Sequence, residues 1–186
     1  MPLTTLDPRS ALMLIDLQKG VVGLPLAHPA APVVAHAAAL AEAFRARGLP
    51  VVLVNVSGGA PGRNEAPRLP VMPEGWDELV PELGRRSNDH CVTKKTWGAF
   101  SVAGLDAHLK GLGVTEIVLA GIATSIGVES TARQAHELGY NLALVVDAMT
   151  DRSAEAHENS AKRIFPRLGE TTTTAELLAD LAKRPK

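Results

Sequence analysis

Short apolar runs alternate with longer stretches of helical periodicity along this chain of 186 residues. Five apolar runs have the length of a strand, and the run at 89–93 is the weakest of them: 11–15, 50–56, 89–93, 117–120 and 142–146. An apolar run without alternation is typical of a parallel strand that is buried on both faces. The stretches between the runs predict helices at 30–47, 102–112, 126–138, 153–168 and 174–181, and the first three of these end at a glycine, the common helix stop.

Strands that alternate with helices predict crossover connections, and therefore a parallel sheet with helices on both faces. We predict a three-layer α/β/α architecture around a central, mostly parallel sheet of five to six strands, with residues 1–186 forming a single domain. The stretch 57–87 is rich in Gly, Pro and Arg and has little periodicity. It predicts a long loop, with a short helix near 76–83.

The composition narrows the class of function. Nineteen basic and twenty acidic residues leave a net charge of -1, so nothing favours nucleic acid or an anionic membrane as a partner. No apolar run approaches the roughly 18 residues of a membrane helix, and the N-terminal residues lack the features of a signal peptide. The single cysteine, Cys91, excludes an intrachain disulfide and is expected to be a small buried side chain of the third strand. We therefore expect a cytoplasmic protein.

Polar side chains stand where the predicted strands end. Asp16 and Gln18 follow the first strand, Lys94 follows the third, residues 121–127 open a helix after the fourth, and Asp147 follows the fifth. Ligands of open parallel sheets bind outside the carboxyl ends of the strands, so we expect an acid, an amine and a helix N-terminus to meet there. The six histidines show no spacing typical of metal ligands, and we expect neither a metal nor a cofactor.

Three segments resemble, in order, the motifs of the isochorismatase-like superfamily, also called the cysteine hydrolases. They are 14–18 (LIDLQ), 94–100 (KKTWGAF) and 119–132 (LAGIATSIGVESTA). The triad of that family is Asp, Lys and a nucleophilic Cys, and Asp16 and Lys94 match its first two members. Gly127 stands at the position of the nucleophile, so a covalent acyl-enzyme cannot form there.

Family members with glycine at this position include isochorismatases, which cleave a vinyl ether and release pyruvate without a nucleophilic residue. The resemblance implies that a protonated Asp16 gives its proton to the methylene carbon of the substrate, after which water adds. Lys94 is then expected to grip a substrate carboxylate or to orient water, and not to pair tightly with Asp16. The resemblance also implies a cis peptide between Ile122 and Ala123, which would aim the N–H groups of Ala123 and Gly127 into the cleft.

The substrate that the resemblance implies is a small anionic molecule, an isochorismate-like dicarboxylate. Four arginines in the long loop are candidates to bind it or are solvated surface residues: Arg63, Arg68, Arg85 and Arg86. Four other residues are expected to contribute to the binding site: Gln18, Trp97, Ala123 and Ser125. Trp97 either lines the pocket, fills the core or forms a subunit contact. The resemblance further implies a homodimer or a homotetramer, with the helix after Gly127 near the contact.

Four other functions are weighed against this interpretation. A family amide hydrolase would use water activated by Asp16, and a binding or scaffold protein would be inactive. A serine hydrolase would use Ser125, Asp147 and His157, but the segment 123–127 departs from the G-x-S-x-G pattern, and Ser125 is expected to cap a helix. A nicotinamidase is disfavoured because its Asp-x-His metal motif is replaced by residues 55–57 (NVS).

Overall fold

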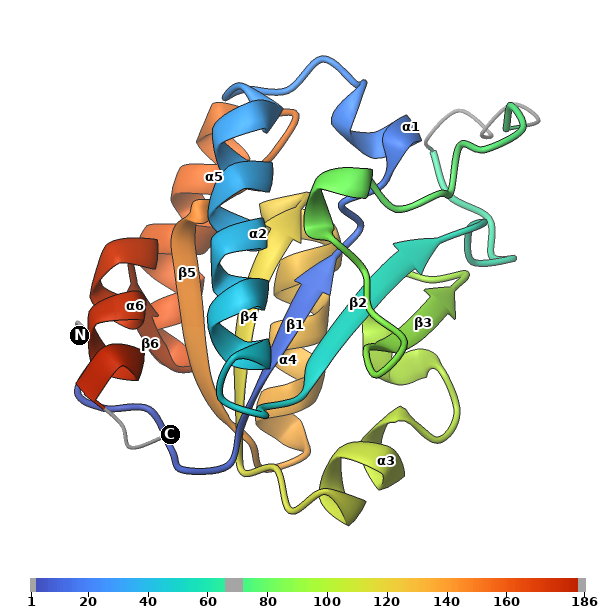
Figure 1. Cartoon of the computed structure of the whole chain (residues 1–186). Helices are drawn as coiled ribbons and strands as arrows, with labels where there is room; N and C mark the ends of the chain where they lie inside the picture. Colours follow the sequence, from blue (N-terminus) through green and yellow to red (C-terminus); the bar gives the residue numbers. More distant parts are fainter. Residues whose placement is uncertain (1–2, 66–71, 184–186) are drawn as a thin grey trace.

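The computed structural model describes residues 3–65 and 72–183, and its strands form one parallel sheet in the order β3-β2-β1-β4-β5-β6 (Figure 1). The strands are β1 (Ser10–Ile15), β2 (Val51–Val56), β3 (His90–Lys94), β4 (Glu116–Ile122), β5 (Asn141–Thr150) and β6 (Glu170–Thr172). The predicted parallel sheet is therefore confirmed.

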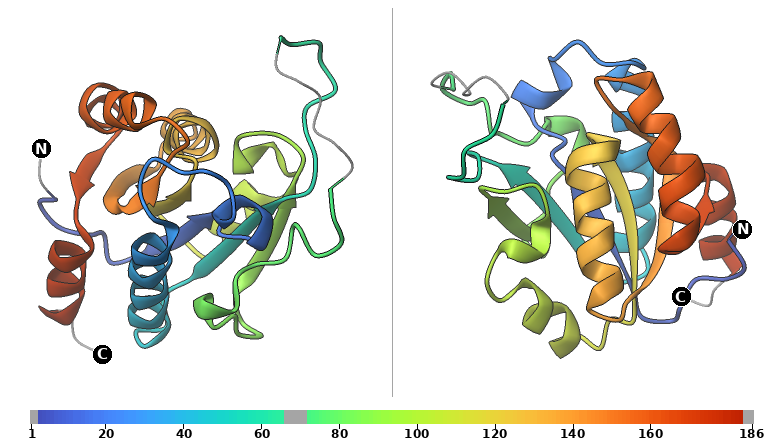
Figure 2. Two further views of the ribbon diagram at one scale, coloured as in Figure 1. Left: turned by 90° about the horizontal axis from the view of Figure 1, so that it is seen from above. Right: turned by 180° about the vertical axis from the view of Figure 1, so that it is seen from behind.

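Helices cover both faces of the sheet, as the alternating pattern predicts (Figure 2). Helices α2 and α6 pack on one face, whereas α3, α4 and α5 lie on the other. The helices are α1 (Lys19–Val22), α2 (Ala30–Arg45), α3 (Leu105–Gly111), α4 (Glu129–Glu137), α5 (Ala154–Asn159) and α6 (Thr174–Lys183). In the part of the chain that is described, no helix combines the length and the apolar character needed to cross a bilayer.

The central strand β1 shows why the apolar runs lack alternation. All six of its residues are buried, and successive side chains enter opposite layers of the core. Leu12 and Leu14 pack in the cluster that includes α2 and α6, whereas Met13 and Ile15 pack in the cluster that includes α3 and α4. Burial on both faces thus favours an apolar residue at successive positions, and Ser10 at the start of the strand is the one polar residue of β1.

The observed elements differ from the predicted ones mainly in the last third of the chain. Strand β5 runs to Thr150, because the pairing of β4 with β5 shifts register between Leu119 and Gly121 and accommodates extra residues. Asp147 therefore lies inside β5 and not at its carboxyl end. Strand β6 was not predicted, because its three residues are polar. The predicted helix 153–168 divides into α5, a π turn at Ser160–Ile164 and a 3₁₀ turn at Phe165–Arg167.

Cys91 is exposed, so its predicted burial is wrong. Strand β3 lies at the edge of the sheet and is covered on one face only, so that Val92 and Lys94 are buried while Cys91 and Thr93 are exposed. In the long loop, a 3₁₀ turn at Pro81–Leu83 stands in place of the helix predicted near 76–83.

The strand order reverses between β1 and β4, because the chain passes from β1 to β2 on one side and later returns to add β4 on the other. Such a reversal opens a crevice at the carboxyl ends of the two strands, where open α/β sheets bind their ligands. Asp16 follows β1 at this point, and the segment 123–128 follows β4.

Candidate active site

Asp16 has a fixed and unusual backbone. Its φ of 52° lies in the left-handed region, which residues other than glycine rarely adopt. The N–H of Asp16 donates to the carbonyl of Val54 in β2 (2.8 Å), and its carbonyl accepts from the N–H of Gln18 (2.9 Å). Such a conformation at a residue other than glycine is concentrated at functional sites, where the surrounding structure maintains it.

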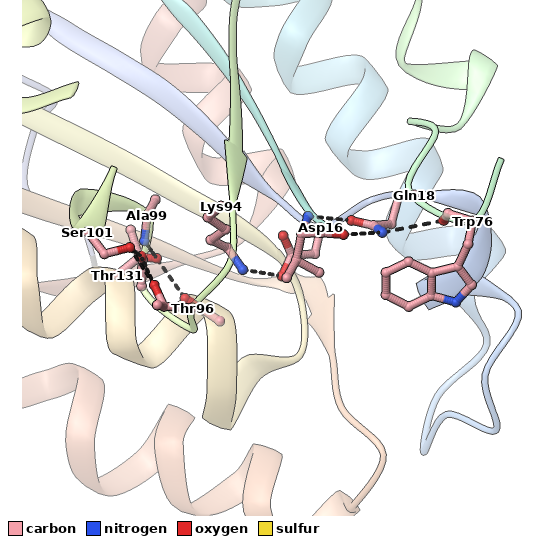
Figure 3. Close-up of polar contacts among 11 residues, drawn as sticks. Asp16, Gln18, Trp76, Lys94, Thr96, Ala99, Ser101 and Thr131 are labelled. Carbon is pink, nitrogen blue, oxygen red and sulfur yellow. Dashed lines mark hydrogen bonds and ion pairs between the residues drawn. The ribbon is translucent and has the colours of Figure 1, made fainter. Parts of the chain in front are cut away.

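Lys94, the last residue of β3, reaches past β2 to Asp16 (Figure 3). Its Nζ donates to Oδ2 of Asp16 at 2.6 Å, and the two side chains are only 1% and 8% exposed. The expectation that Lys94 avoids a tight pair with Asp16 is therefore wrong. Burial is the reason, because an ammonium removed from water needs a close acceptor.

Burial raises the pKa of Asp16 from its ordinary value of 3.8 to about 6, although the charge and hydrogen bond of Lys94 act to lower it. The second carboxyl oxygen, Oδ1, is buried and has no hydrogen-bond partner among the described residues. Asp16 can therefore hold a proton near neutral pH, with Oδ1 as the oxygen that is free of the lysine.

Gly127 faces this ion pair from the end of β4. The peptide bond between Ile122 and Ala123 is cis, and a π turn at Thr124–Val128 follows it. A Cβ atom built on Gly127 would lie 3.1 Å from Oδ2 of Asp16, 3.7 Å from Nζ of Lys94 and 3.0 Å from Cγ2 of Ile15. The structure thus brings Asp16, Lys94 and Gly127 together, with no side chain on the third.

This geometry predicts that Gly127→Cys creates a reactive thiol, after Ile15 shifts by a few tenths of an ångström. The ammonium of Lys94 favours the thiolate, which is the form that iodoacetamide alkylates. In a Cys91→Ser background, which removes the exposed natural thiol, we expect alkylation to slow by about tenfold or more when Lys94→Met is added. Mass spectrometry of the labelled protein measures both rates. An inert thiol would contradict the assignment of position 127 to the site.

Ser125 lies in the π turn at Thr124–Val128 and is held there by a carboxylate. Its N–H and its hydroxyl both donate to Oδ2 of Asp151, at 2.7 and 2.8 Å. The expected capping role of Ser125 is therefore wrong, because its hydroxyl is a donor to a carboxylate. Asp151 was missed by the sequence analysis, since the fifth strand was predicted to end at residue 146 and Asp151 follows its actual end at Thr150.

The residues of the alternative serine triad are apart. Asp147 accepts two hydrogen bonds from Thr174 at the start of α6, at 2.7 and 2.9 Å. Nδ1 of His157 pairs with the hydroxyl of Thr124 at 2.8 Å, and Ser125 is bound to Asp151. A serine hydrolase mechanism through these three residues is thus excluded.

Gln18 is buried and its amide is engaged inside the protein. Its Nε2 donates to the carbonyls of Val56 and Trp76, at 3.0 and 3.4 Å, and its Oε1 accepts from the N–H of Val56 at 2.8 Å (Figure 3). Gln18 therefore joins the segment after β1 to β2, and its amide is already used in hydrogen bonds within the protein. Trp97 is 65% exposed, so it does not fill the core.

Two of the arginine candidates lie away from Asp16. Arg86 pairs with Glu42, and its N–H donates to the carboxylate of Asp89, which immediately precedes β3. Arg86 and its neighbour Arg85 are therefore near the amino end of β3, the edge opposite the carboxyl ends. Arg63 is exposed, and Arg68 lies outside the described residues.

The ion pair is nearly closed from solvent. A hollow of about 520 Å³ beside α1 is lined by Trp76 and Glu78 among others, and one of about 500 Å³ is lined by residues such as Glu116 and Glu170. Neither hollow is lined by the three site residues.

Within 3–65 and 72–183, no group of three or more His, Cys, Asp or Glu side chains is arranged to hold a metal ion.

Comparisons with known proteins identify the family of the chain. Residues 10–176 match the model of the isochorismatase domain. An uncharacterized isochorismatase family protein of Bacillus subtilis (strain 168), YwoC, is 43% identical over 178 residues, which are 91% of this chain and 93% of that protein. Streptothricin hydrolase of Streptomyces noursei is 37% identical over 140 residues, covering 74% of this chain and 48% of that one. The structure of an isochorismatase family protein from Burkholderia thailandensis superposes with a TM-score of 0.91 at 44% identity, covering 96% and 98% of the two chains.

Proposed function

The chain belongs to the isochorismatase family of hydrolases, and on this basis we propose that it hydrolyses the vinyl ether of a small anionic substrate of the isochorismate type, without a covalent intermediate. One observation carries the proposal. A carboxyl group whose pKa is about 6 faces a residue with no side chain, so the site offers a proton but no nucleophile.

The proposed reaction needs one acid and one water molecule. Asp16 gives its proton to the terminal methylene carbon of the enolpyruvyl ether, and the double bond becomes an oxocarbenium ion. Water adds to the cationic carbon and returns a proton to the Asp16 carboxylate. The resulting hemiketal transfers its hydroxyl proton to the ether oxygen and divides into an alcohol and pyruvate. The sum is the addition of one water molecule.

Lys94 has a different role in this proposal from the one expected of it. Burial raises the pKa of the Asp16 carboxyl, and the ammonium at 2.6 Å opposes this rise, so that the pKa lies at about 6. A general acid works best when its pKa lies near the pH of the reaction. We propose that Lys94 tunes Asp16 and that the peptide at Ala123 and the exposed ring of Trp97 supply contacts to substrate.

The pH dependence of turnover tests the proposal. Because Asp16 must carry a proton, kcat/KM for pyruvate release from isochorismate is expected to be constant below about pH 6 and to fall about tenfold per pH unit above it. Pyruvate is followed with a coupled assay from about pH 4.5 to 8.5. If the protein instead hydrolyses an amide, and kcat/KM rises up to about pH 6 and then levels off, the result would support the alternative in which ionised Asp16 activates a water molecule. A protein that turns over neither substrate would be the inactive binding member.

A further inference from the structure

Thr131 of α4 connects the two segments that flank the ion pair. Its hydroxyl donates to the carbonyl of Gly127 at 2.7 Å and accepts from the N–H of Ala99 at 3.1 Å (Figure 3). Gly127 belongs to the glycine turn, residues 123–128, and Ala99 belongs to the lysine loop, residues 95–101. A hydroxyl has one hydrogen and two lone pairs, so a single threonine can make both bonds. The side chain is fully buried.

Gln134, one helical turn further along α4, holds the same loop. Its Oε1 accepts from the N–H of Phe100 at 3.1 Å. The backbone at Gly98 lies directly against this amide, because a Cβ built on Gly98 would come within 2.1 Å of Oε1. Within the loop, the hydroxyl of Ser101 donates to the carbonyl of Gly98 at 2.8 Å. The lysine loop is thus a compact turn that is fastened to α4.

We propose that Thr131 and Gln134 are positioning residues that fix the lysine loop on the glycine turn, and so hold Nζ of Lys94 at Asp16 and Gly127. Lys94 ends an edge strand, so β2 supports it from one side only. The loop that follows Lys94 is held on α4 by the N–H groups of Ala99 and Phe100. The catalytic consequence rests on the proposed function, whereas the geometric one does not.

Loosening the contact between the lysine loop and α4 is expected to raise the pKa of Asp16. The ammonium of Lys94 lowers the pKa of the carboxyl, and burial raises it. When the lysine loop is no longer anchored, Nζ moves away from Oδ2 and its effect weakens while burial remains. The pKa of Asp16 then rises above about 6, and the descending limb of kcat/KM moves to higher pH.

The test compares Thr131→Val, which keeps the shape but loses both hydrogen bonds, with Thr131→Ser, which keeps the hydroxyl. For Thr131→Val we expect kcat/KM to fall roughly 10- to 100-fold, mainly in kcat, because small misplacements of a reacting group cost rate. Thr131→Ser is expected to stay within about threefold of the unchanged protein. Thr172→Val is the matched control, since Thr172 is a buried threonine of β6 whose hydroxyl bonds Glu176. Rate loss in the control equal to that in Thr131→Val would overturn the proposal.

Titration of the Asp16 carboxyl carbon by ¹³C NMR decides the geometric part without any substrate. Thr131→Val is expected to raise this pKa, and Thr131→Ser and Thr172→Val are expected to leave it in place. Gln134→Met changes a half-buried side chain and serves as the second variant if Thr131→Val does not fold; its Asp16 titration should move in the same direction. An unmoved titration in the folded variant would overturn the proposal, whereas a moved titration in a protein without turnover would support it and contradict only the proposed reaction.

Discussion

Asp16→Asn is expected to lower kcat/KM for vinyl-ether hydrolysis by about 10²- to 10⁴-fold, the usual contribution of a general acid. The amide keeps the size of the carboxyl group and tolerates the positive φ of 52°, but it has no proton to transfer near neutral pH. The residual rate should lose its dependence on pH around pH 6, because the group that titrates there is gone. Steady-state pyruvate release at several pH values measures both effects.

A matched control separates this loss from a loss of folding. Arg45 and Asp89 form a second buried ion pair, with 2.7 Å between Nη2 and Oδ2 and side chains 3% and 1% exposed. Asp89 precedes β3 and therefore lies at the amino end of that strand, whereas Asp16 lies at the carboxyl end of β1. Asp89→Asn is expected to cost stability while leaving kcat/KM unchanged. Retention of activity within tenfold by Asp16→Asn would refute Asp16 as the acid.

Lys94→Met is expected to destabilise the fold by about 3 kcal/mol near pH 8, because it leaves the carboxylate of Asp16 buried without a counter-ion. Near pH 5 the cost should be under about 1 kcal/mol, since Asp16 is then protonated and the neutral methionine replaces a buried ammonium. Urea unfolding at the two pH values measures the difference.

The sign follows from the pKa of Asp16. In the folded protein this pKa, about 6, lies above the ordinary value of 3.8, so stability falls as the pH rises between these values and then levels off. Without the ammonium the folded pKa is higher still, and the loss of stability continues to higher pH. The double variant Asp16→Asn/Lys94→Met has neither charge and should show no such slope. An equal cost of Lys94→Met at both pH values would contradict the raised pKa.

The sheet and the place of the site follow from the sequence because both depend on local patterns. Continuous apolar runs identify parallel strands that are buried on both faces, and Asp16 and Lys94 each stand at a strand end, where family motifs mark them as well. Gly127 is identified from the sequence alone, and the distances from a Cβ built on it to Asp16 and Lys94 place it at the ion pair.

The features that the sequence did not predict depend on tertiary contacts between residues that are far apart in the chain. The tight pairing of Lys94 with Asp16 reflects burial of a lysine, a property that its neighbours in sequence do not indicate. Asp151 was not predicted as a site residue, because the register shift between β4 and β5 extends β5 beyond its predicted end. The role of Thr131 depends on a hydrogen bond to Ala99, 32 residues away in the chain. Strand β6 is stabilised by pairing with β5, although none of its three residues is apolar.

The exposed thiol of β3 is a convenient site for attaching a spectroscopic probe. Cys91 is the only cysteine of the chain, lies on the same strand as Lys94, and projects from the opposite face of that strand because the two positions differ by an odd number of residues. A fluorophore coupled to Cys91 would therefore lie on the solvent side of β3, on the strand whose last residue pairs with Asp16, and would not enter the core.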